Sequence, residues 1–304
     1  MVKESITALT PEIIKNWQNY DFKKFDVVRE KGEKIYTGKI HPVNQVIEYV
    51  RRIWLDMGFK EMKGNKIVQA FWNFDALFTP QDHPAREMQD TFYLKASANK
   101  IDAPPSIIKR VKEMHEKGDE RSEGWQYKWS EKLASKYVLR THTTALSALT
   151  LASLTEKDLP AKYFAIGKVF RNETLDWKHL FEFYQVEGFV ADNSVNFRHL
   201  LGYLKVFFQK MGYDKIRVRP AYFPYTELSL EIEVFMPDKG WVELAGAGIF
   251  RPEVVKPLIG KEIKVLAWGL GLERIIMNYY GFKDIRDVYT KNIDLLRNLK
   301  RWYY

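Results

Sequence analysis

The sequence contains no cysteine among its 304 residues. A chain without thiols can form no disulfide framework, no thiolate metal site and no cysteine nucleophile. This composition is typical of a reducing compartment, so we expect a cytoplasmic protein. The sequence also has no stretch of about 18 uncharged apolar residues, and it does not begin with an apolar leader of the secretory kind. We therefore expect neither a membrane span nor secretion.

Several common active-site motifs are also missing. There is no GxxxxGKS/T phosphate loop, no HExxH helix and no GxSxG elbow. The six histidines do not fall at the spacings of a metal site. These absences argue against nucleotide chemistry of the P-loop or dinucleotide-binding kind.

Aromatic and basic residues, in contrast, are plentiful. The chain is 46% hydrophobic and contains 9 Trp, 17 Tyr and 19 Phe, which is enough to bury a large core and excludes a disordered chain. Lys and Arg number 48 against 39 Asp and Glu, for a net charge of +9 and a pI near 9.3. Such a charge favours a polyanionic partner such as RNA without requiring one.

The apolar pattern divides the chain near residue 40. Residues 1–40 are polar, basic and weakly periodic, and we interpret them as a lead-in segment. From Val43 to Met57 apolar residues recur at helical spacing and Gly58 follows, which predicts a helix over 41–58. Residues 41–304 are expected to form one large domain.

Strand patterns dominate the second half of the chain. Apolar and polar residues alternate from Leu228 to Met236, and the turn sequence 237–240 should return the chain into an antiparallel partner over 241–249. Strands occur in groups, with helices between them at irregular intervals. This order predicts an α+β fold with an antiparallel β-sheet flanked by helices.

Three further local expectations can be checked against the structure. The apolar run 67–72 predicts a strand, and Asn193 is expected to cap a helix that continues to Met211. Residues 115–128 mix both charges with two glycines, which favours an exposed and dispensable loop.

Two constellations suggest chemistry. In the first, Arg171, Glu173, Phe183, Gln185 and Glu187 fall on the same faces of a predicted hairpin. Such a polar row is costly to bury unless a ligand or mutual pairing satisfies it, and the aromatic residues around it are typical of a pocket for a flat polar ring. A solvated hairpin face with salt bridges is the alternative.

The second constellation is the sequence WGLGLER, which covers 268–274. Gly269 and Gly271 would let the backbone approach a ligand at the start of a helix, where free N–H groups favour phosphate, and Arg274 adds a positive charge one turn later. Close packing of the helix on the sheet, with Arg274 on the surface, is the alternative.

These motifs resemble those of a known enzyme family. FRNE with the downstream FYQVEG resembles motif 2 of class II aminoacyl-tRNA synthetases, GLGLER resembles motif 3, and the helix over 41–58 occupies the place of motif 1. More specifically, four segments resemble the catalytic α subunits of phenylalanyl-tRNA synthetases of archaeal and eukaryotic type. These segments are NFDALFTPQDHPAREMQDTFYL (73–94), LRTHTTAL (139–146), FPYTELS (223–229) and WVELAGAG (241–248).

The resemblance implies a phenylalanine–tRNA ligase that converts phenylalanine and ATP to phenylalanyl-adenylate and passes the amino acid to tRNA(Phe). Arg171 and Arg274 would be catalytic, the first on the α-phosphate and the second over the adenine and on the γ-phosphate. The other ATP-binding residues would be Glu173, His179 and Phe183, the last stacked on the adenine. Glu243 would hold Mg²⁺, with Glu231 and Glu233 as weaker candidates.

The resemblance also implies a set of residues around the amino acid: His142, Thr144, Gln185, Glu187, Phe223, Tyr225 and Ala267. Gln185 and Glu187 would hold the ammonium group, and Ala267 would form the floor under the phenyl ring. The segments 83–86 and 90–93 are family marks without an assigned role, except that Tyr93 is expected to wall the pocket.

The family enzyme is a heterotetramer of two α and two β subunits, so a β subunit is an implied partner. The chain departs from the family in motif 1, where Asn65 and Val68 stand in place of the usual proline and glutamate, and only about 40 residues precede the helix where family members carry a larger tRNA-contacting region. Two alternatives therefore remain. One is a non-catalytic paralogue that acts as a binding or regulatory module, and the other is a class II relative specific for another amino acid.

Overall fold

The computed structural model describes residues 5–6, 8–22, 38–87 and 90–302. Contacts divide the chain into residues 1–39 and 40–304, which we describe separately. In the first unit, β1 (Ser5–Ile6) pairs in parallel with β2 (Asp21–Phe22). Between them lie α1 (Pro11–Lys15), which is capped by Thr10, and η1 (Trp17–Asn19). None of the helices described in either unit is long and apolar enough to cross a membrane.

The second unit is built on a sheet of seven strands in the order β3-β7-β8-β12-β11-β10-β9. Its strands are β3 (Lys60–Glu61), β7 (Ala161–Phe170), β8 (Glu182–Ala191), β9 (Ile216–Phe223), β10 (Thr226–Met236), β11 (Gly240–Phe250) and β12 (Val265–Gly271). The short β3 pairs in parallel with β7, and the other neighbours are antiparallel. The predicted α+β fold and the β10–β11 hairpin are confirmed. Leu228 is nevertheless exposed, because a register shift between Thr226 and Ser229 breaks the alternation.

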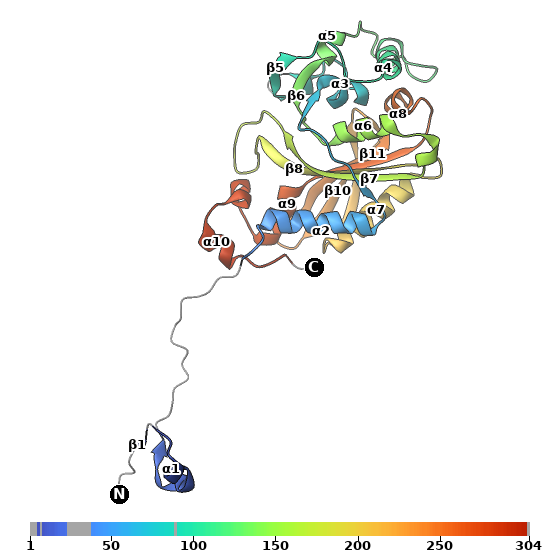
Figure 1. The fold of residues 1–304 in the computed structure, drawn as a ribbon. Coiled ribbons are helices and arrows are strands. Elements are labelled where there is room, and N and C mark those ends of the chain that lie inside the picture. The colour runs from blue at the N-terminus through green and yellow to red at the C-terminus, as the bar shows by residue number, and fades with distance from the viewer. Residues whose placement is uncertain (1–4, 7, 23–37, 88–89, 303–304) are drawn as a thin grey trace. The chain divides into compact units, whose positions relative to one another are not determined.

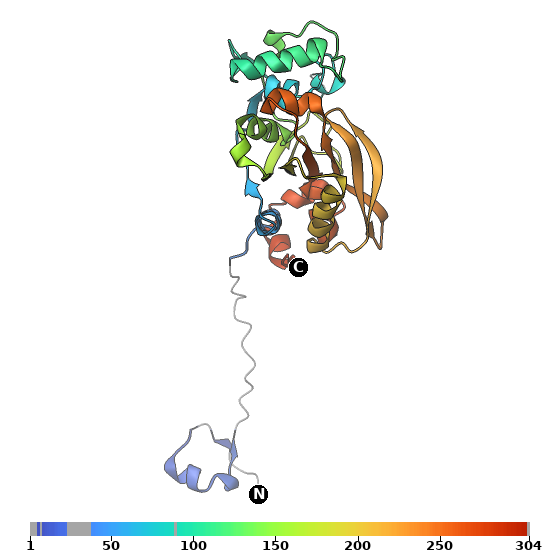
Figure 2. The same ribbon diagram turned by 90° about the vertical axis from the view of Figure 1, so that its right-hand side faces the viewer.

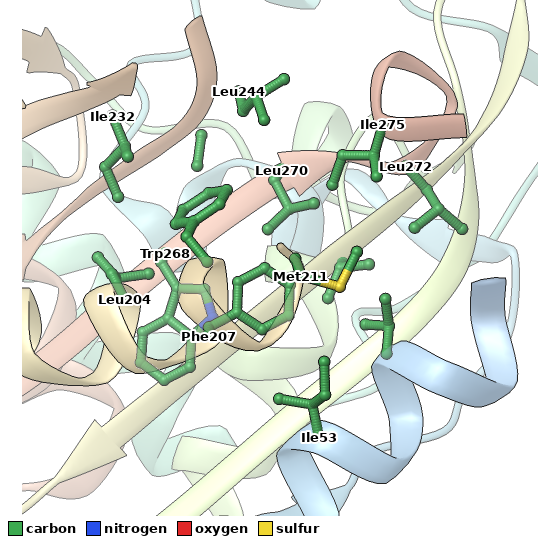
Figure 3. Close-up of a cluster of buried hydrophobic side chains, with 14 of the residues drawn as sticks. Ile53, Leu204, Phe207, Met211, Ile232, Leu244, Trp268, Leu270, Leu272 and Ile275 are labelled. Atoms are coloured by element: carbon green, nitrogen blue, oxygen red, sulfur yellow. The ribbon is translucent and has the colours of Figure 1, made fainter. Parts of the chain in front are cut away.

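Three helices cover one face of this sheet: α2 (Pro42–Asp56), α7 (Phe197–Lys210) and α9 (Leu272–Tyr280) (Figure 1). The ring of Trp54 on α2 stacks on Phe207 of α7 at 4.7 Å and on Trp268 of β12 at 4.9 Å between centroids. Figure 3 shows Phe207 and Trp268 in the same buried cluster as Ile53 of α2. The helix predicted over 41–58 is confirmed as α2.

The other face is covered at one end only. There α6 (Thr144–Ser153) and α8 (Pro252–Ile259) pack on Ala165, Phe189 and Val265. Beyond them lies a small antiparallel sheet together with several short helices (Figures 1 and 2). The sheet consists of β4 (Ile67–Gln69), β5 (Tyr93–Ser97) and β6 (Lys136–Leu139). The helices are α3 (Ala70–Asn73), α4 (Pro105–Lys117) and α5 (Glu131–Ala134). The uncovered part of this face includes residues of β8, β11 and β12 that line a cavity.

The remaining helices of this unit are short and lie between the elements named above or after them. They are η2 (Asp75–Leu77), η3 (Pro84–Arg86), η4 (Glu156–Asp158), η5 (Ile285–Tyr289) and α10 (Ile293–Asn298).

Two predicted boundaries were wrong. The strand expected over 67–72 ends at Gln69, and the following residues form α3, all of whose residues are buried. A helical turn projects its side chains in every direction, which suits an apolar segment enclosed on all sides. The second boundary concerns the helix expected to begin after Asn193. This helix is α7, and it begins after Asn196 instead. The Asn196 side chain accepts hydrogen bonds from the N–H groups of Arg198 and His199, while the His199 ring accepts one from the N–H of Asn196.

The expectation of a dispensable loop over 115–128 was also wrong. His115 is fully buried, and its ring forms hydrogen bonds of 2.8 Å with the Tyr127 hydroxyl and with the carbonyl of Asp75. The ring of Trp125 stacks on Phe78 at 5.0 Å. The aromatic residues of this stretch are therefore packed against the core, although the charged residues between them had indicated an exposed loop.

Candidate active site

A cavity of about 290 Å³ lies over β8, β11 and β12, on the face of the sheet that also carries α6 and α8. It is lined by almost all of the residues that the sequence singled out: Thr144, Arg171, Glu173, His179, Phe183, Gln185, Glu187, Phe223, Tyr225, Glu243, Ala267 and Arg274. They include residues of both constellations, and Thr144, Phe223, Tyr225, Glu243 and Ala267 come from other segments. The fold thus brings several separate stretches of chain to one site.

The polar row follows from the alternation of β8. Phe183, Gln185 and Glu187 lie opposite Val169, Gly167 and Ala165 of β7, so all three face the same side of the sheet. Arg171 follows β7, and its N–H donates to the carbonyl of Phe181 at 3.0 Å. Its guanidinium lies 5.2 Å from the centre of the Phe183 ring. The predicted common face is confirmed for Phe183, Gln185 and Glu187, whereas Arg171 and Glu173 follow the end of β7 and lie outside the strand pairing.

Glu187 lies at the buried end of this row, with 2% of its surface exposed. Its carboxylate accepts hydrogen bonds from the hydroxyls of Ser147 at 2.6 Å, Thr144 at 2.7 Å and Thr143 at 3.1 Å. Burial raises the pKa of Glu187 to about 7, while these hydroxyls and the charge of Arg140 act in the opposite direction. Sequence reasoning missed Thr143 and Ser147, although hydroxyls three to four residues apart at the start of a helix share one face.

The position of the Gln185 side chain explains why one of the two glycines of the GLGLER motif carries no side chain. Its Oε1 accepts the N–H of Thr143 at 2.9 Å, and its Nε2 would lie 2.9 Å from a β-carbon at Gly269. Gly269 therefore makes room for a side chain of the site itself. Gly271, which also lines the cavity, has no atom within 4 Å of its β-carbon position, so the start of α9 remains open to a ligand.

The rim of the cavity carries Arg274 and Glu243. The Arg274 Nη1 donates to the main-chain carbonyl of Glu243 at 3.2 Å, which holds the first turn of α9 beside β11. The Glu243 carboxylate takes part in none of the ion pairs found in the described part of the chain. Glu231 and Glu233, in contrast, do not line the cavity and pair with Arg219 and Arg217.

The donor set fits a magnesium ion that is held mainly by substrate. Within the described residues no group of three or more His, Cys, Asp or Glu side chains could hold a metal ion. Mg²⁺ commonly uses one or two carboxylates together with substrate phosphates and water, and Glu243 can supply one such carboxylate.

His142 is the exception among the predicted site residues. It lines an adjoining cavity of about 370 Å³, together with His83 and Asp90, and the two cavities share Arg171, Glu173 and Tyr225. Its Nδ1 is buried and has no hydrogen-bond partner. Burial and the charge of Arg171 lower the pKa of His142 to about 3, so its ring is neutral.

The family segments without an assigned role belong to the wall of this second cavity. Arg86 donates from Nη1 to the buried carboxylate of Asp75 at 2.9 Å, and its guanidinium lies 4.9 Å from the centre of the Phe74 ring. The hydroxyl of Tyr93 donates to the carbonyl of Arg86 at 2.8 Å. Tyr93 itself lines neither cavity, so its expected position in the wall was wrong, and it supports the wall from behind.

Comparisons with known proteins show that the sequence is similar to one family. Residues 24–299 match the model of the tRNA synthetases class II core domain (F). The chain is 50% identical to the phenylalanine–tRNA ligase alpha subunit of Methanocaldococcus jannaschii, over 98% of this chain and 61% of the relative. For the subunits of the same name from Archaeoglobus fulgidus and Methanopyrus kandleri the identities are 51% and 49%, over 98% of this chain and 62% and 57% of the relatives. The chain therefore spans about 60% of the length of these relatives.

Proposed function

Because the chain belongs to the family of class II tRNA synthetase core domains, we propose that it is the catalytic part of a phenylalanine–tRNA ligase alpha subunit. It would convert phenylalanine and ATP to phenylalanyl-adenylate and pyrophosphate, and then transfer the amino acid to tRNA(Phe). The observation that carries this proposal is that Arg171 and Arg274 line a single cavity with Phe183, while the buried Glu187 lines the same cavity. Two cations and an aromatic ring suit a nucleotide, and a buried carboxylate suits an ammonium group.

On the nucleotide side, the substrate carboxylate oxygen attacks the α-phosphorus and pyrophosphate leaves. Arg171 stabilises the negative charge that develops on the α-phosphate, and for this its guanidinium leaves the face of Phe183. The adenine stacks on Phe183, while Glu173 and His179 contact the adenine and the distal phosphates, and Arg274 reaches the γ-phosphate. Glu243 would hold Mg²⁺, which neutralises charge on the triphosphate when bound.

On the amino-acid side, Gln185 and Glu187 hold the ammonium group. A bound cation lowers the pKa of Glu187 from its raised value, so the substrate itself stabilises the carboxylate. The rings of Phe223 and Tyr225 lie 6.4 Å apart with 16° between their planes, and the phenyl ring of the substrate packs against their edges. Ala267 closes the pocket below the ring, and Thr144 and the neutral His142 complete it.

The partners follow from the same proposal. The curated relatives are named alpha subunits, which supports a β subunit as partner and a heterotetramer of two α and two β chains. The net charge of +9 supports binding of tRNA, and the cysteine-free composition supports a cytoplasmic location.

Amino-acid-dependent exchange of pyrophosphate into ATP tests the function. We expect exchange with phenylalanine, by the chain alone or together with a β subunit, and we expect none with the other standard amino acids. Exchange with a different amino acid only would contradict the substrate. Exchange with none, with or without the β subunit, would support a non-catalytic paralogue.

A further inference from the structure

Arg140 belongs to the segment LRTHTTAL but has no part in the proposed mechanism. It follows β6 directly and only 4% of its surface is exposed. Its Nε donates to the carbonyl of Lys168 at 2.8 Å, and its Nη1 lies 3.4 Å from the carbonyls of Gly64 and Asn65. Of the ion pairs within the described ranges, none includes Arg140. It is thus a buried cation that is satisfied by backbone carbonyls, two of them from the turn where the sequence departs from the family.

The guanidinium of Arg140 occupies the space that a side chain at residue 167 would fill beside the polar row. Gly167 on β7 lies opposite Gln185, and a β-carbon at Gly167 would overlap Nη2 of Arg140 and lie 3.2 Å from its Cζ. The next pair along the same face is Ala165 opposite Glu187. The cation therefore lies on the site face of the sheet, beside the two residues proposed to hold the ammonium group.

The charge of Arg140 acts on Glu187. It lowers the pKa of this buried carboxyl, against the effect of burial. The other groups that face Glu187 are the hydroxyls of Thr143, Thr144 and Ser147, and the phenol of Tyr225, whose pKa burial raises to about 12. These groups are uncharged at neutral pH, so Arg140 provides a fixed positive charge for Glu187.

We infer that Arg140 is a positioning residue of the amino-acid site, which holds the Gln185–Glu187 row in place and keeps Glu187 ionised for the substrate ammonium group. This inference rests on the proposed function. A cation bonded to Glu187 directly would occupy the carboxylate oxygens that the ammonium group needs. Arg140 is bonded to backbone carbonyls instead, so its charge reaches Glu187 without taking a further position on the carboxylate oxygens.

The test measures pyrophosphate exchange from about pH 6 to pH 9, a range that spans the pKa of Glu187, for the wild type, Arg140→Met and Arg140→Lys. In Arg140→Met we expect the KM for phenylalanine to rise about tenfold and the acid limb of kcat/KM for phenylalanine to move to higher pH by about one unit. The KM for ATP should stay within about twofold of the wild type. Arg140→Lys keeps the charge, so its acid limb should coincide with that of the wild type.

Arg110→Met is the matched control, because Arg110 also donates to backbone carbonyls, but it lies on α4 and bonds to Pro257 and Leu258 of α8 rather than beside the Gln185–Glu187 row. It should leave both KM values and the pH profile unchanged. An unshifted acid limb in folded Arg140→Met, or an equal rise in both KM values, would overturn the inference. Failure of both Arg140 variants to fold would also overturn it, since Arg140 would then serve stability alone. Absence of exchange in the wild type would instead refute the proposed function itself.

Discussion

The ring of Phe223 lies directly over Gly246, so that a β-carbon at residue 246 would stand 2.6 Å from its Cζ. Both residues line the cavity, Phe223 from β9 and Gly246 from β11. The absence of a side chain at Gly246 therefore makes room for a ring that is proposed to contact the substrate.

Gly246→Ala should push the Phe223 ring into the space for the amino acid. We expect the KM for phenylalanine in pyrophosphate exchange to rise about tenfold or more, because a small displacement of a positioning group has a large effect. Gly202→Ala is the control, since no atom lies within 4 Å of its β-carbon position on α7. That variant should keep the wild-type KM. Equal KM values for Gly246→Ala and the wild type would contradict the assignment of the amino-acid pocket.

Ala267→Gly should widen the pocket below the phenyl ring. Ala267 lines the cavity with only 6% of its surface exposed, so loss of its methyl group adds space inside the site. We expect kcat/KM for para-chlorophenylalanine in exchange to rise about tenfold relative to phenylalanine, the scale of one methyl group in an apolar pocket. Unchanged relative rates with such analogues would show that the ring binds elsewhere.

Asp75→Asn should destabilise the fold strongly. The Asp75 carboxylate is fully buried and accepts from Arg86, Gln81 and Trp129, so its replacement by an amide leaves the buried Arg86 charge without a negatively charged partner. We expect a loss of about 3–5 kcal/mol in the free energy of unfolding, measured by urea denaturation. The exposed pair of Arg121 and Glu262 is the control, and Arg121→Ala should cost less than about 1 kcal/mol. Equal losses in the two variants would contradict the role of the buried pair.

Glu273 should make stability depend on pH. It is buried, and burial raises its pKa to about 7 although the Tyr184 N–H and the Tyr289 hydroxyl donate to it. The folded state therefore prefers the protonated acid, so its contribution to stability is complete below about pH 4.5 and is lost as pH rises through about 7.

Glu273→Gln should remove this dependence. Relative to the wild type, the variant should gain roughly 3 kcal/mol in the free energy of unfolding between about pH 5 and pH 8, since one pKa unit corresponds to about 1.4 kcal/mol. Urea denaturation at both values measures the difference. Parallel pH profiles for the two proteins would show that Glu273 is ionised in the folded state without penalty.

The parts of the fold that the sequence could predict are those fixed by local periodicity. Alternation along β8 determined that Gln185 and Glu187 share a face with Phe183, and the apolar stripe before Gly58 determined α2. These patterns depend on neighbours in the chain, so they can be read without knowledge of the tertiary contacts.

The remaining features depend on contacts between distant segments. Because α6 is buried on most sides, its sequence could not reveal that Thr143 and Ser147 turn their hydroxyls toward Glu187. His142 lies in the second cavity because the segment containing His83 and Asp90 encloses that space. Likewise, Arg140 belongs to the site through Gly167, a contact between residues 27 positions apart that no spacing rule predicts.

Binding of a non-hydrolysable phenylalanyl-adenylate analogue, measured by titration calorimetry, tests the central claim most directly, because it requires neither tRNA nor a β subunit. We expect one binding site per chain in the wild type and affinity at least about tenfold weaker in Arg171→Ala and in Arg274→Ala, since each removes a charged contact. No binding by the folded wild-type chain, or equal affinity in all three proteins, would contradict the claim.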